Sequence, residues 1–433
     1  MQGRFYATMG ISVRNRASLG RLKERAARKS GRLVVVTGAR QTGKTTLVKA
    51  AFPDWPYISL EDPVVRPSYA RLSAADWIAR YPLAVLDEVQ KVPSLVESIK
   101  AAYDASDTVR YLLLGSSQIL LLSKVRESLA GRVAIEELWP LTLPELATNG
   151  WDEPVTTSRF VEWLCQGGGD CRALLGATVS SASEARAGID LERYLQWGGM
   201  PAVHDPDFTD GERRDWLTDY RRTYLQRDVA DLAALRDLEP FVRAQDALAL
   251  RTGTLVNLAD LGRAASISPQ TAGRFLRYLE LSYQVLVLPP FHRNLEKRLA
   301  KMPKVHLMDP GVGRAITGRW GQLTGEEFES AVVSEIVRQV RSAGFRWPFF
   351  HLRTHDGREV DLLIELEAGF VAVEVKQTAG VARSDARHLR GLQSFLDRPL
   401  LGSVVLSQDR DARELEPGVV ALPVAWALGA SGE

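Results

Sequence analysis

The first segment that could do chemistry is Gly38-Ala-Arg-Gln-Thr-Gly-Lys-Thr45, which fits the pattern G-x-x-x-x-G-K-[ST]. It follows an apolar run, Leu33–Val36, and precedes a helical pattern over Thr45–Ala51. In that context the loop N–H groups can surround phosphate oxygens, and the helix N-terminus adds a favourable dipole. Lys44 would place its charge on the β- and γ-phosphates, and the Thr45 hydroxyl would bind Mg²⁺. The residues predicted to bind ATP are Gly38, Ala39, Arg40, Gln41, Thr42, Gly43, Lys44, Thr45 and Thr46.

Two acidic residues end a later apolar run, Leu83-Ala-Val-Leu-Asp87-Glu88. Acids at the end of a strand beside a phosphate loop can hold Mg²⁺ and activate water. We expect Asp87 to hold the ion through water, and Glu88 to orient or deprotonate the attacking water. The alternative is an ordinary solvated strand end.

Two further groups are expected around the γ-phosphate. The apolar run Leu112–Leu114 leads to Ser116 and Ser117, and a serine at this strand tip, with Ser117 as the first candidate, could sense the phosphate. Hydrolysis also needs a cation on the developing charge, for which Arg132 is the first candidate and Arg126 the second. An arginine of this kind often acts in trans, which would imply a homo-oligomer. Otherwise these serines and arginines are turn and surface residues.

Two alternating patterns near the C-terminus, Glu359–Glu365 and Phe370–Lys376, predict strands. Side chains two residues apart share a strand face, so Glu374 and Lys376 should lie together. A hairpin between the strands would bring Asp361 beside Glu374. Two carboxylates can hold Mg²⁺ and leave coordination sites open for water and phosphate.

This pattern resembles the PD-(D/E)xK nuclease superfamily. The resemblance implies that Asp361 and Glu374 bind Mg²⁺ and that Lys376 positions or activates the hydrolytic water. Glu329, on a helix expected over Glu326–Val340, would be an accessory ligand or a structural partner. The alternative is a nuclease-like fold with a salt-bridged Glu/Lys strand and no cleavage.

A helix-turn-helix pattern lies between these two candidate sites. Ser268 is a good N-cap and Pro269 suits the first position of a helix over Pro269–Leu281, which resembles the second helix of a winged helix. From Arg263 to Lys304 there are eight basic and two acidic residues. Such a module can bind the DNA major groove, with its cations on phosphates. The alternative is a module that docks a protein, with its basic residues solvated.

The elements that must position these residues alternate between strand and helix over residues 31–150, which predicts a parallel sheet covered by helices. The expected fold class is α/β: a P-loop parallel-sheet ATPase domain, a helical and winged-helix domain, and a C-terminal α/β nuclease-like domain. The expected domains are a basic N-terminal helix (1–30), an AAA+-type ATPase domain (31–150), a helical linker or lid (151–240), a winged helix-turn-helix (241–309) and the nuclease-like domain (310–433).

The composition of the 433 residues is that of an ordinary globular protein, 45% hydrophobic and 25% charged, which excludes a disordered or fibrous chain. The net charge of +2 conceals nine basic residues and one acid within residues 1–32. The N-terminal helix therefore becomes a second candidate for DNA contact. Two cysteines and no long apolar run suit a cytoplasmic protein without a membrane anchor.

Together these motifs resemble the AAA+-type predicted ATPases of bacteria and archaea, in which a C-terminal domain of unknown function follows the ATPase. The matching segments are Gly38–Thr46, Leu86–Gln90, Gly115–Ser117, Ser128–Arg132, Gly198–Pro201, Tyr224–Val229, Glu359–Asp361 and Glu374–Lys376. Two departures, Asp309-Pro-Gly-Val in place of Asp-x-Gly-Leu and a Gly/Ser-rich insertion at 165–185, are expected to lie in loops.

Two functions remain open from the sequence. The first is an enzyme that hydrolyses ATP with Mg²⁺ and couples nucleotide state to DNA binding, with a possible Mg²⁺-dependent nuclease module. The second is a nucleotide-gated switch or remodelling ATPase that binds a protein partner, with a nuclease-like domain that does not cleave.

Overall fold

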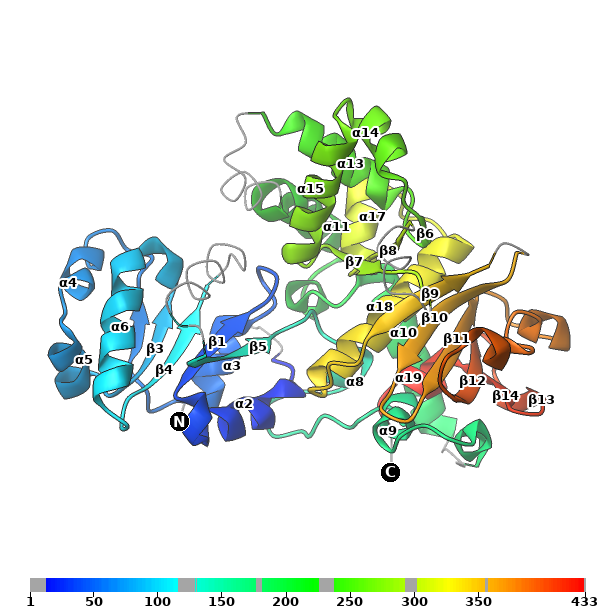
Figure 1. Ribbon diagram of the computed structural model, residues 1–433, viewed down its shortest axis with the longest axis horizontal. Helices are drawn as coiled ribbons and strands as arrows, with labels where there is room; N and C mark the ends of the chain where they lie inside the picture. The colour runs from blue at the N-terminus through cyan, green and yellow to red at the C-terminus, as the bar shows by residue number, and fades with distance from the viewer. Residues whose placement is uncertain are drawn as a thin grey trace.

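The computed structural model describes residues 13–115, 129, 131–176, 181–225, 237–292, 302–354 and 357–431. Three parts follow one another along the chain: an N-terminal α/β domain, a middle module of helices with a small sheet, and a C-terminal domain built on a larger sheet (Figure 1). The middle module lies above the space between the other two parts in this view. Among the described residues, no helix has both the length and the apolar composition needed to cross a membrane.

The N-terminal domain is a five-stranded parallel sheet with the strand order β2-β3-β4-β1-β5. Its strands are β1 (Leu33–Thr37), β2 (Tyr57–Ser59), β3 (Leu83–Asp87), β4 (Arg110–Leu114) and β5 (Val133–Glu137). Its helices are α2 (Ser18–Ala27), α3 (Lys44–Ala51), α4 (Arg66–Ala70), α5 (Ala74–Arg80) and α6 (Pro93–Ala105). The predicted parallel α/β domain is confirmed, although the sequence did not predict β5.

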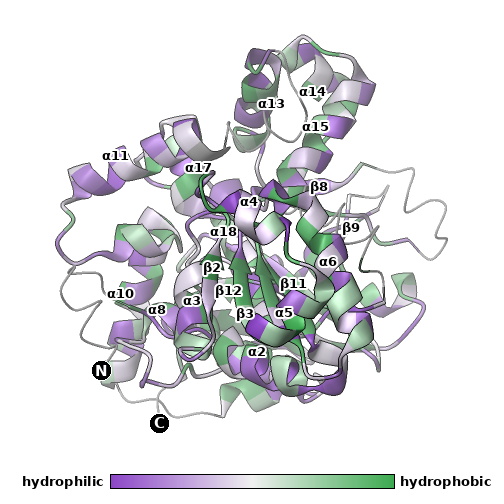
Figure 2. Ribbon diagram, turned by 90° about the vertical axis from the view of Figure 1, so that its left-hand side faces the viewer, coloured by the Kyte–Doolittle hydropathy of each residue, from purple (hydrophilic) through white to green (hydrophobic). Residues whose placement is uncertain are grey.

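Both faces of this sheet are covered, which is why β1 is apolar at four successive positions. Leu33 and Val35 pack into the core that includes α5 and α6. Val34 and Val36 pack into the opposite core, with α2 and α3. A parallel strand buried on both faces has no polar side to expose. Figure 2 shows the apolar strands of this sheet between helices of mixed hydropathy.

The middle module has a three-stranded antiparallel sheet with the order β6-β8-β7. Its elements are α11 (Asp210–Tyr220), α13 (Glu239–Ala249), β6 (Thr254–Leu255), α14 (Leu258–Ala265), α15 (Pro269–Leu281), β7 (Val285–Leu288), β8 (Lys304–Leu307) and α17 (Pro310–Thr317). Phe241, Leu261 and Phe275 form its core together with Val312 and Ile316 of α17. The helix α17 therefore packs with the middle module, whereas the sequence placed it at the start of the C-terminal domain.

The C-terminal domain is a six-stranded mixed sheet with the order β13-β14-β12-β11-β10-β9. Its elements are α18 (Gly325–Ser342), β9 (Phe349–Arg353), β10 (Glu359–Glu365), β11 (Phe370–Lys376), β12 (Leu400–Ser407), β13 (Arg413–Glu416), β14 (Val419–Pro423) and α19 (Val424–Leu428). The hairpin of β10 and β11 is antiparallel, as predicted, with Leu362 opposite Val373. Between β11 and β12 lie two short 3₁₀ turns, Arg383–Ala386 and Leu392–Phe395.

Two helices expected in a linker or lid belong to the C-terminal domain. The helices α9 (Arg159–Cys165) and α10 (Ser181–Trp197) place Phe160, Trp163 and Leu191 in one core with α18 and the large sheet. Apolar side chains of both helices are buried in that core, so this part of 151–240 packs with the C-terminal domain. In the middle module, α11 is followed by a π-helical turn, Arg221–Leu225, and residues 226–236 lie outside the described parts.

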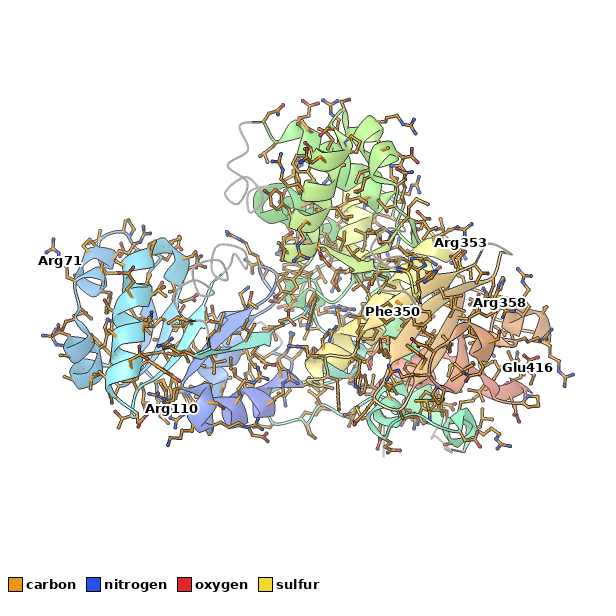
Figure 3. The ribbon with its side chains drawn as sticks, in the orientation of Figure 1. Arg71, Arg110, Phe350, Arg353, Arg358 and Glu416 are labelled. Atoms are coloured by element: carbon orange, nitrogen blue, oxygen red, sulfur yellow. The ribbon has the colours of Figure 1, made fainter. Side chains whose placement is uncertain are left out.

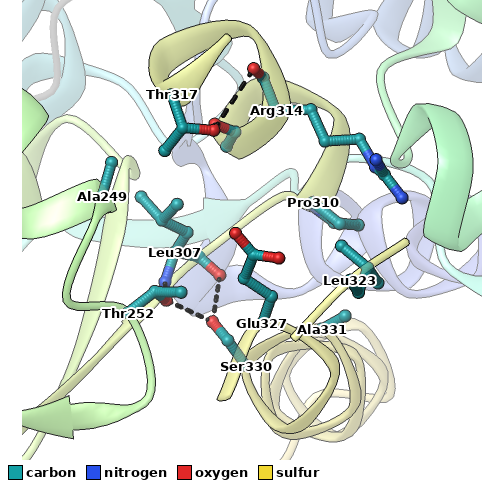
Figure 4. A pocket seen from close by; sticks show the side chains of 11 residues that line it. Ala249, Thr252, Leu307, Pro310, Arg314, Thr317, Leu323, Glu327, Ser330 and Ala331 are labelled. Carbon is teal, nitrogen blue, oxygen red and sulfur yellow. Dashed lines mark hydrogen bonds between the residues drawn. The ribbon is translucent and has the colours of Figure 1, made fainter. Parts of the chain in front are cut away.

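The middle and C-terminal parts meet along α17 and α18. Close packing leaves a cavity of about 20 Å³ there, enough for a single water molecule (Figure 4). On its wall the Thr252 and Ser330 hydroxyls are 2.7 Å apart, and Thr252 Oγ1 accepts a hydrogen bond of 2.9 Å from the Leu307 N–H. Nearby, the Gly199 N–H donates to the buried Asp309 carboxylate at 2.6 Å. These contacts join segments more than 50 residues apart into one interface.

Candidate functional site

The phosphate loop lies between β1 and the first turn of α3, as predicted. Gly38 and Gly43 have φ angles of 145° and 91°, in a region that favours glycine. A Cβ atom on Gly38 would lie 2.0 Å from the Leu138 carbonyl oxygen, so no larger residue fits beside β5. Gly43 is the N-cap of α3, which makes the loop end at a helix N-terminus. This is the backbone geometry of an anion-binding loop.

Hydrogen bonds within the loop hold its shape. The Lys44 ammonium donates to the carbonyls of Gly38 at 2.9 Å and Ala39 at 2.7 Å. The buried Thr42 hydroxyl donates to the same Ala39 carbonyl at 2.8 Å. From outside the loop, the buried Arg16 guanidinium donates to the Thr42 carbonyl at 3.3 Å. Lys44 therefore lies over the loop, where a phosphate group would meet its charge.

The predicted metal-holding pair is brought together by the fold. Thr45 Oγ1 donates to Asp87 Oδ2 at 3.0 Å, although the residues are 42 positions apart. The Tyr57 hydroxyl on β2 donates to the same oxygen. Burial, and then the neighbouring Asp87 carboxylate, raise the pKa of Tyr57, so the phenol stays protonated and remains a donor. A hydroxyl and a carboxylate that converge in this way fit Mg²⁺ bound with nucleotide.

Sequence reasoning did not identify Tyr57 as a site residue. Tyr57 lies on β2, and the sequence does not show which strand pairs with β2. The structure pairs β2 with β3, with Ser59 opposite Asp87, and this register brings the tyrosine to the carboxylate. Only the strand order could identify the partner of this hydroxyl.

Glu88 follows Asp87 in a left-handed conformation with φ 57°. Its N–H donates to Asp87 Oδ1 at 2.9 Å, and the Gln90 amide donates to its carboxylate. Few residues other than glycine, asparagine and aspartate adopt this conformation, and such strain is commonest at functional sites. The two acids are therefore held by each other and by Gln90.

The remaining residues expected at the γ-phosphate divide into two groups. Ser116, Ser117 and Arg126 lie outside the described residues. Arg132 is described, and its guanidinium pairs with Asp104 at 2.8 and 3.1 Å. It directly precedes β5, whereas the phosphate loop follows the parallel strand β1. Arg132 therefore lies at the N-terminal ends of the parallel strands, whereas the phosphate loop lies at their C-terminal ends. The structure does not bring Arg132 to the loop of its own chain.

The middle module touches the phosphate loop directly. The Tyr220 hydroxyl, at the end of α11, donates to the Arg40 carbonyl at 3.0 Å. Tyr283 packs edge-on against Trp139 with ring centroids 4.9 Å apart, in a cluster that includes Ala39 of the loop. A change in the conformation of the loop on nucleotide binding would therefore alter its contacts with α11 and with the segment before β7.

The C-terminal acidic residues also come together. Asp361 Oδ2 accepts a hydrogen bond of 2.9 Å from the Val375 N–H, and Lys376 donates to Glu374 at 2.6 Å. Burial, and then the charge of Asp361, raise the pKa of Glu374 to about 8. Glu374 therefore holds a proton more readily than an exposed glutamate does, while its contact with Lys376 opposes that shift of the pKa.

A lysine that the sequence analysis counted only as part of a basic patch joins this group. Lys304 of β8 is 2% exposed and lies within ion-pair distance of Glu329, Glu359 and Asp361. Burial alone would lower the pKa of Lys304, but the charges of Asp361 and Glu329 outweigh it and raise the pKa above its ordinary value. A pocket of about 460 Å³ opens beside these residues, with Arg353 on its wall (Figure 3).

The arrangement does not provide a ready metal centre. Within the described parts of the chain, no group of three or more histidine, cysteine or acidic side chains is placed to hold a metal ion. The resident cations Lys304 and Lys376 already pair with the carboxylates that were expected to bind Mg²⁺. Asp361, Glu374 and Lys376 are thus adjacent as expected, but as members of an ion-pair cluster.

Several basic residues of the N-terminal segment form ion pairs with buried carboxylates. Arg21 and Arg25 of α2 pair with Glu136 of β5, which is only 1% exposed. Arg16 is buried and pairs with Glu145 at 3.4 Å. These cations are occupied by internal carboxylates, so little of the predicted N-terminal DNA surface is left on the described helix.

Exposed basic residues of the middle module include Arg263 on α14 and two arginines on α15. Ser268 caps this helix by accepting from the Thr271 N–H, as the sequence predicted. Arg274 and Arg277 are exposed on it, and Arg277 pairs with Glu280. Arg263 pairs with Asp260, and the other four basic residues counted before Lys304 fall within 293–301, outside the described residues.

Comparisons with known proteins agree with this division of the chain. The family model described as AAA domain matches residues 30–147. Two models described as Domain of unknown function match residues 188–322 (DUF8612) and 324–427 (DUF4143). The junction near residue 323 separates α17 from α18, as the packing does.

The related sequences add no functional assignment to the match with the AAA domain. Uncharacterised proteins of Mycobacterium tuberculosis and Mycobacterium bovis are each 26% identical over 405 residues, which cover 90% of this chain and 80% of the relative. A Walker-type ATPase of Pyrococcus abyssi aligns at 14% identity and a TM-score of 0.41, over 66% of this chain and 91% of that one.

Proposed function

We propose that this chain, which carries a P-loop ATPase domain, binds ATP with Mg²⁺ at residues 38–46 and hydrolyses it. The observation that carries the proposal is the hydrogen bond of 3.0 Å between Thr45 and Asp87. It joins the end of the phosphate loop to the acid at the end of β3. The match of residues 30–147 to the AAA domain supports the same function.

Each residue of this site would have a separate role in hydrolysis. Loop N–H groups and Lys44 would bind the phosphates, and Thr45 and Asp87 would hold the Mg²⁺ that neutralises their charge. Glu88 would orient a water and accept its proton as the water oxygen bonds to the γ-phosphorus. The bond from the γ-phosphorus to the β–γ bridging oxygen breaks, and ADP and inorganic phosphate leave. Tyr57 would keep the Asp87 carboxylate in place.

The test of this function is the Lys44→Ala variant. Loss of the ammonium should reduce ATP turnover by about 100-fold or more, because the positive charge on the transferred phosphate is lost. Phosphate release is the measurement, and circular dichroism checks the fold. Lys23→Ala, an exposed lysine on α2, is the matched control and should keep wild-type turnover. Unchanged turnover in Lys44→Ala would overturn the assignment.

We further propose that the middle module binds DNA and that the nucleotide state of the ATPase domain controls this binding. The element order of three helices with a short strand, followed by the paired strands β7 and β8, supports the proposal of a winged helix. In that fold the second helix of the helix-turn-helix, here α15, enters the major groove. Its exposed Arg274 and Arg277 would contact phosphates.

Salt dependence tests the DNA proposal. Each phosphate contact contributes about 0.9 to the slope of log K against log[salt], so the double variant Arg274→Ala/Arg277→Ala should reduce the slope by about 2. Arg80→Ala, on an exposed helix of the ATPase domain, is the control. No salt-dependent binding by the wild type would favour the second candidate, a switch that binds a protein. Contact of Tyr220 with the phosphate loop supports nucleotide coupling for either partner.

A further inference from the structure

Lys304 connects two parts of the molecule at a single buried point. Its Nζ atom lies 2.7 Å from Glu329 Oε1, 3.1 Å from Asp361 Oδ1 and 3.2 Å from Glu359 Oε1. The lysine belongs to the small sheet of the middle module, whereas its three partners belong to α18 and β10 of the C-terminal domain. A buried ammonium needs this many oxygen partners because it has lost its hydration.

Three of the carboxylate oxygens that a metal ion would use already have protein partners, whereas Glu374 Oε2 is buried without a hydrogen bond to the described residues. Asp361 Oδ1 pairs with Lys304, and Asp361 Oδ2 accepts from the Val375 N–H. On the next strand, Glu374 Oε1 accepts from Lys376 at 2.6 Å. A divalent ion bound at Asp361 Oδ1 would compete with Lys304 for that oxygen.

Electrostatics also disfavour an added dication. A Mg²⁺ bound to Asp361 Oδ1 would lie about 2.1 Å from that oxygen, and therefore within roughly 5 Å of the Lys304 ammonium. Like charges at that separation repel strongly in a partly dry pocket. The pocket walls carry five acidic side chains against four lysines and arginines, so little negative charge is left to compensate.

We propose that Lys304 is the resident cation of this pocket, that it takes the place of a divalent metal ion, and that it fastens the middle module to the C-terminal domain. The proposal goes beyond the proposed ATPase function and does not depend on it. It assigns to the carboxylate cluster the role of an ion-pair joint. Removal of Lys304 should then both open the site to metal and loosen the joint.

Metal binding by the nucleotide-free protein tests whether Lys304 takes the place of a divalent metal ion. Mn²⁺ serves as the probe, its free concentration is followed by electron paramagnetic resonance, and the site is defined as the binding lost on Asp361→Asn. Wild type should show no such binding at millimolar Mn²⁺, and Lys304→Met should bind roughly tenfold more tightly or better. Binding by wild type that Asp361→Asn abolishes would overturn the proposal, as would no gain in Lys304→Met.

A charge-matched variant keeps this test decisive if Lys304→Met does not fold. Lys304→Met with Glu329→Gln removes one charge of each sign and retains Asp361 and Glu374. It should show the same Asp361-dependent gain in Mn²⁺ affinity, because the ammonium is gone. Absence of that gain in the folded double variant overturns the proposal.

Amide hydrogen exchange tests the joint. Lys304→Met should raise exchange in β8 and β10 at least several-fold, while β1 of the ATPase domain keeps its wild-type rates. Lys91→Met is the matched control, since Lys91 makes an exposed ion pair with Glu61 within the ATPase domain. Unchanged exchange in β8 and β10 would contradict the fastening role.

Discussion

At the scale of single residues, Asp87 is the point where the ATPase site is assembled. One of its oxygens accepts from Thr45 and Tyr57, and the other accepts from the Glu88 N–H. A carboxylate held by three donors has one orientation, which a metal-holding group needs. Tyr57 contributes a protonated hydroxyl, because burial and Asp87 raise its pKa.

Tyr57→Phe tests this positioning role. Loss of a hydrogen bond to a charged carboxylate costs about 1.5–3 kcal/mol, so ATP turnover should fall roughly tenfold or more, with the fold intact. Steady-state phosphate release at saturating ATP is the measurement. Tyr103→Phe on α6 is the control, because the ring of Tyr103 contacts Arg32. Equal turnover in Tyr57→Phe and wild type would remove Tyr57 from the site.

At the scale of elements, close backbone approach fixes how helices meet. Gly311, in the first turn of α17, lies so near the end of α10 that a Cβ atom would be 1.9 Å from the Trp197 carbonyl oxygen. Gly198 is similarly close to Asp309, whose carboxylate accepts from the Gly199 N–H. These glycines therefore set the contact between a helix of the C-terminal domain and one of the middle module.

Gly311→Ala should destabilise this contact by about 3 kcal/mol, at the upper end of overpacking costs, because rigid backbone would have to move. Chemical denaturation followed by tryptophan fluorescence measures the change, since Trp197 and Trp320 report on this core. Gly321→Ala is the matched control, with open space around the added methyl group. A loss below about 0.5 kcal/mol in Gly311→Ala would contradict the close contact.

At the scale of the whole molecule, the middle module contacts both candidate sites. Tyr220 and Tyr283 reach the phosphate-loop side, and Lys304 reaches the carboxylate pocket. Because β7 and β8 are paired strands of one sheet, Tyr283, just before β7, and Lys304 are held in a fixed relation. A movement of the loop can therefore be transmitted to the middle module as a unit.

Tyr220→Phe should weaken this transmission. ATP is expected to alter amide exchange in α11 of the wild type, and loss of a hydrogen bond worth about 1 kcal/mol should reduce that change roughly fivefold. Exchange with and without ATP, followed by mass spectrometry, is the measurement. Tyr278→Phe on α15 is the control. An identical ATP effect in Tyr220→Phe and wild type would show that coupling does not pass through this contact.

Local patterns predicted much of the ATPase domain and part of its site. The glycine spacing and the acids at the end of β3 predicted both halves of the proposed nucleotide site. The strand β5 was missed, and with it the position of Arg132, because a five-residue strand at a sheet edge has a weak pattern. The helices α9 and α10 were expected in a linker, since their periodicity shows an apolar face but not which sheet buries it.

By itself the sequence determined the local chemistry of this protein: a phosphate loop that needs glycine φ angles, an acidic strand end, and alternating strands that carry Asp361 and Glu374. Tertiary structure decided which charges meet. It pairs Arg25 of the basic N-terminal segment with Glu136 and brings the Tyr57 hydroxyl to the Asp87 carboxylate. It also places Lys304 beside carboxylates that lie 25 to 57 residues later in the sequence. The reason is physical: backbone periodicity is local, whereas the partner of a buried charge depends on how distant segments pack.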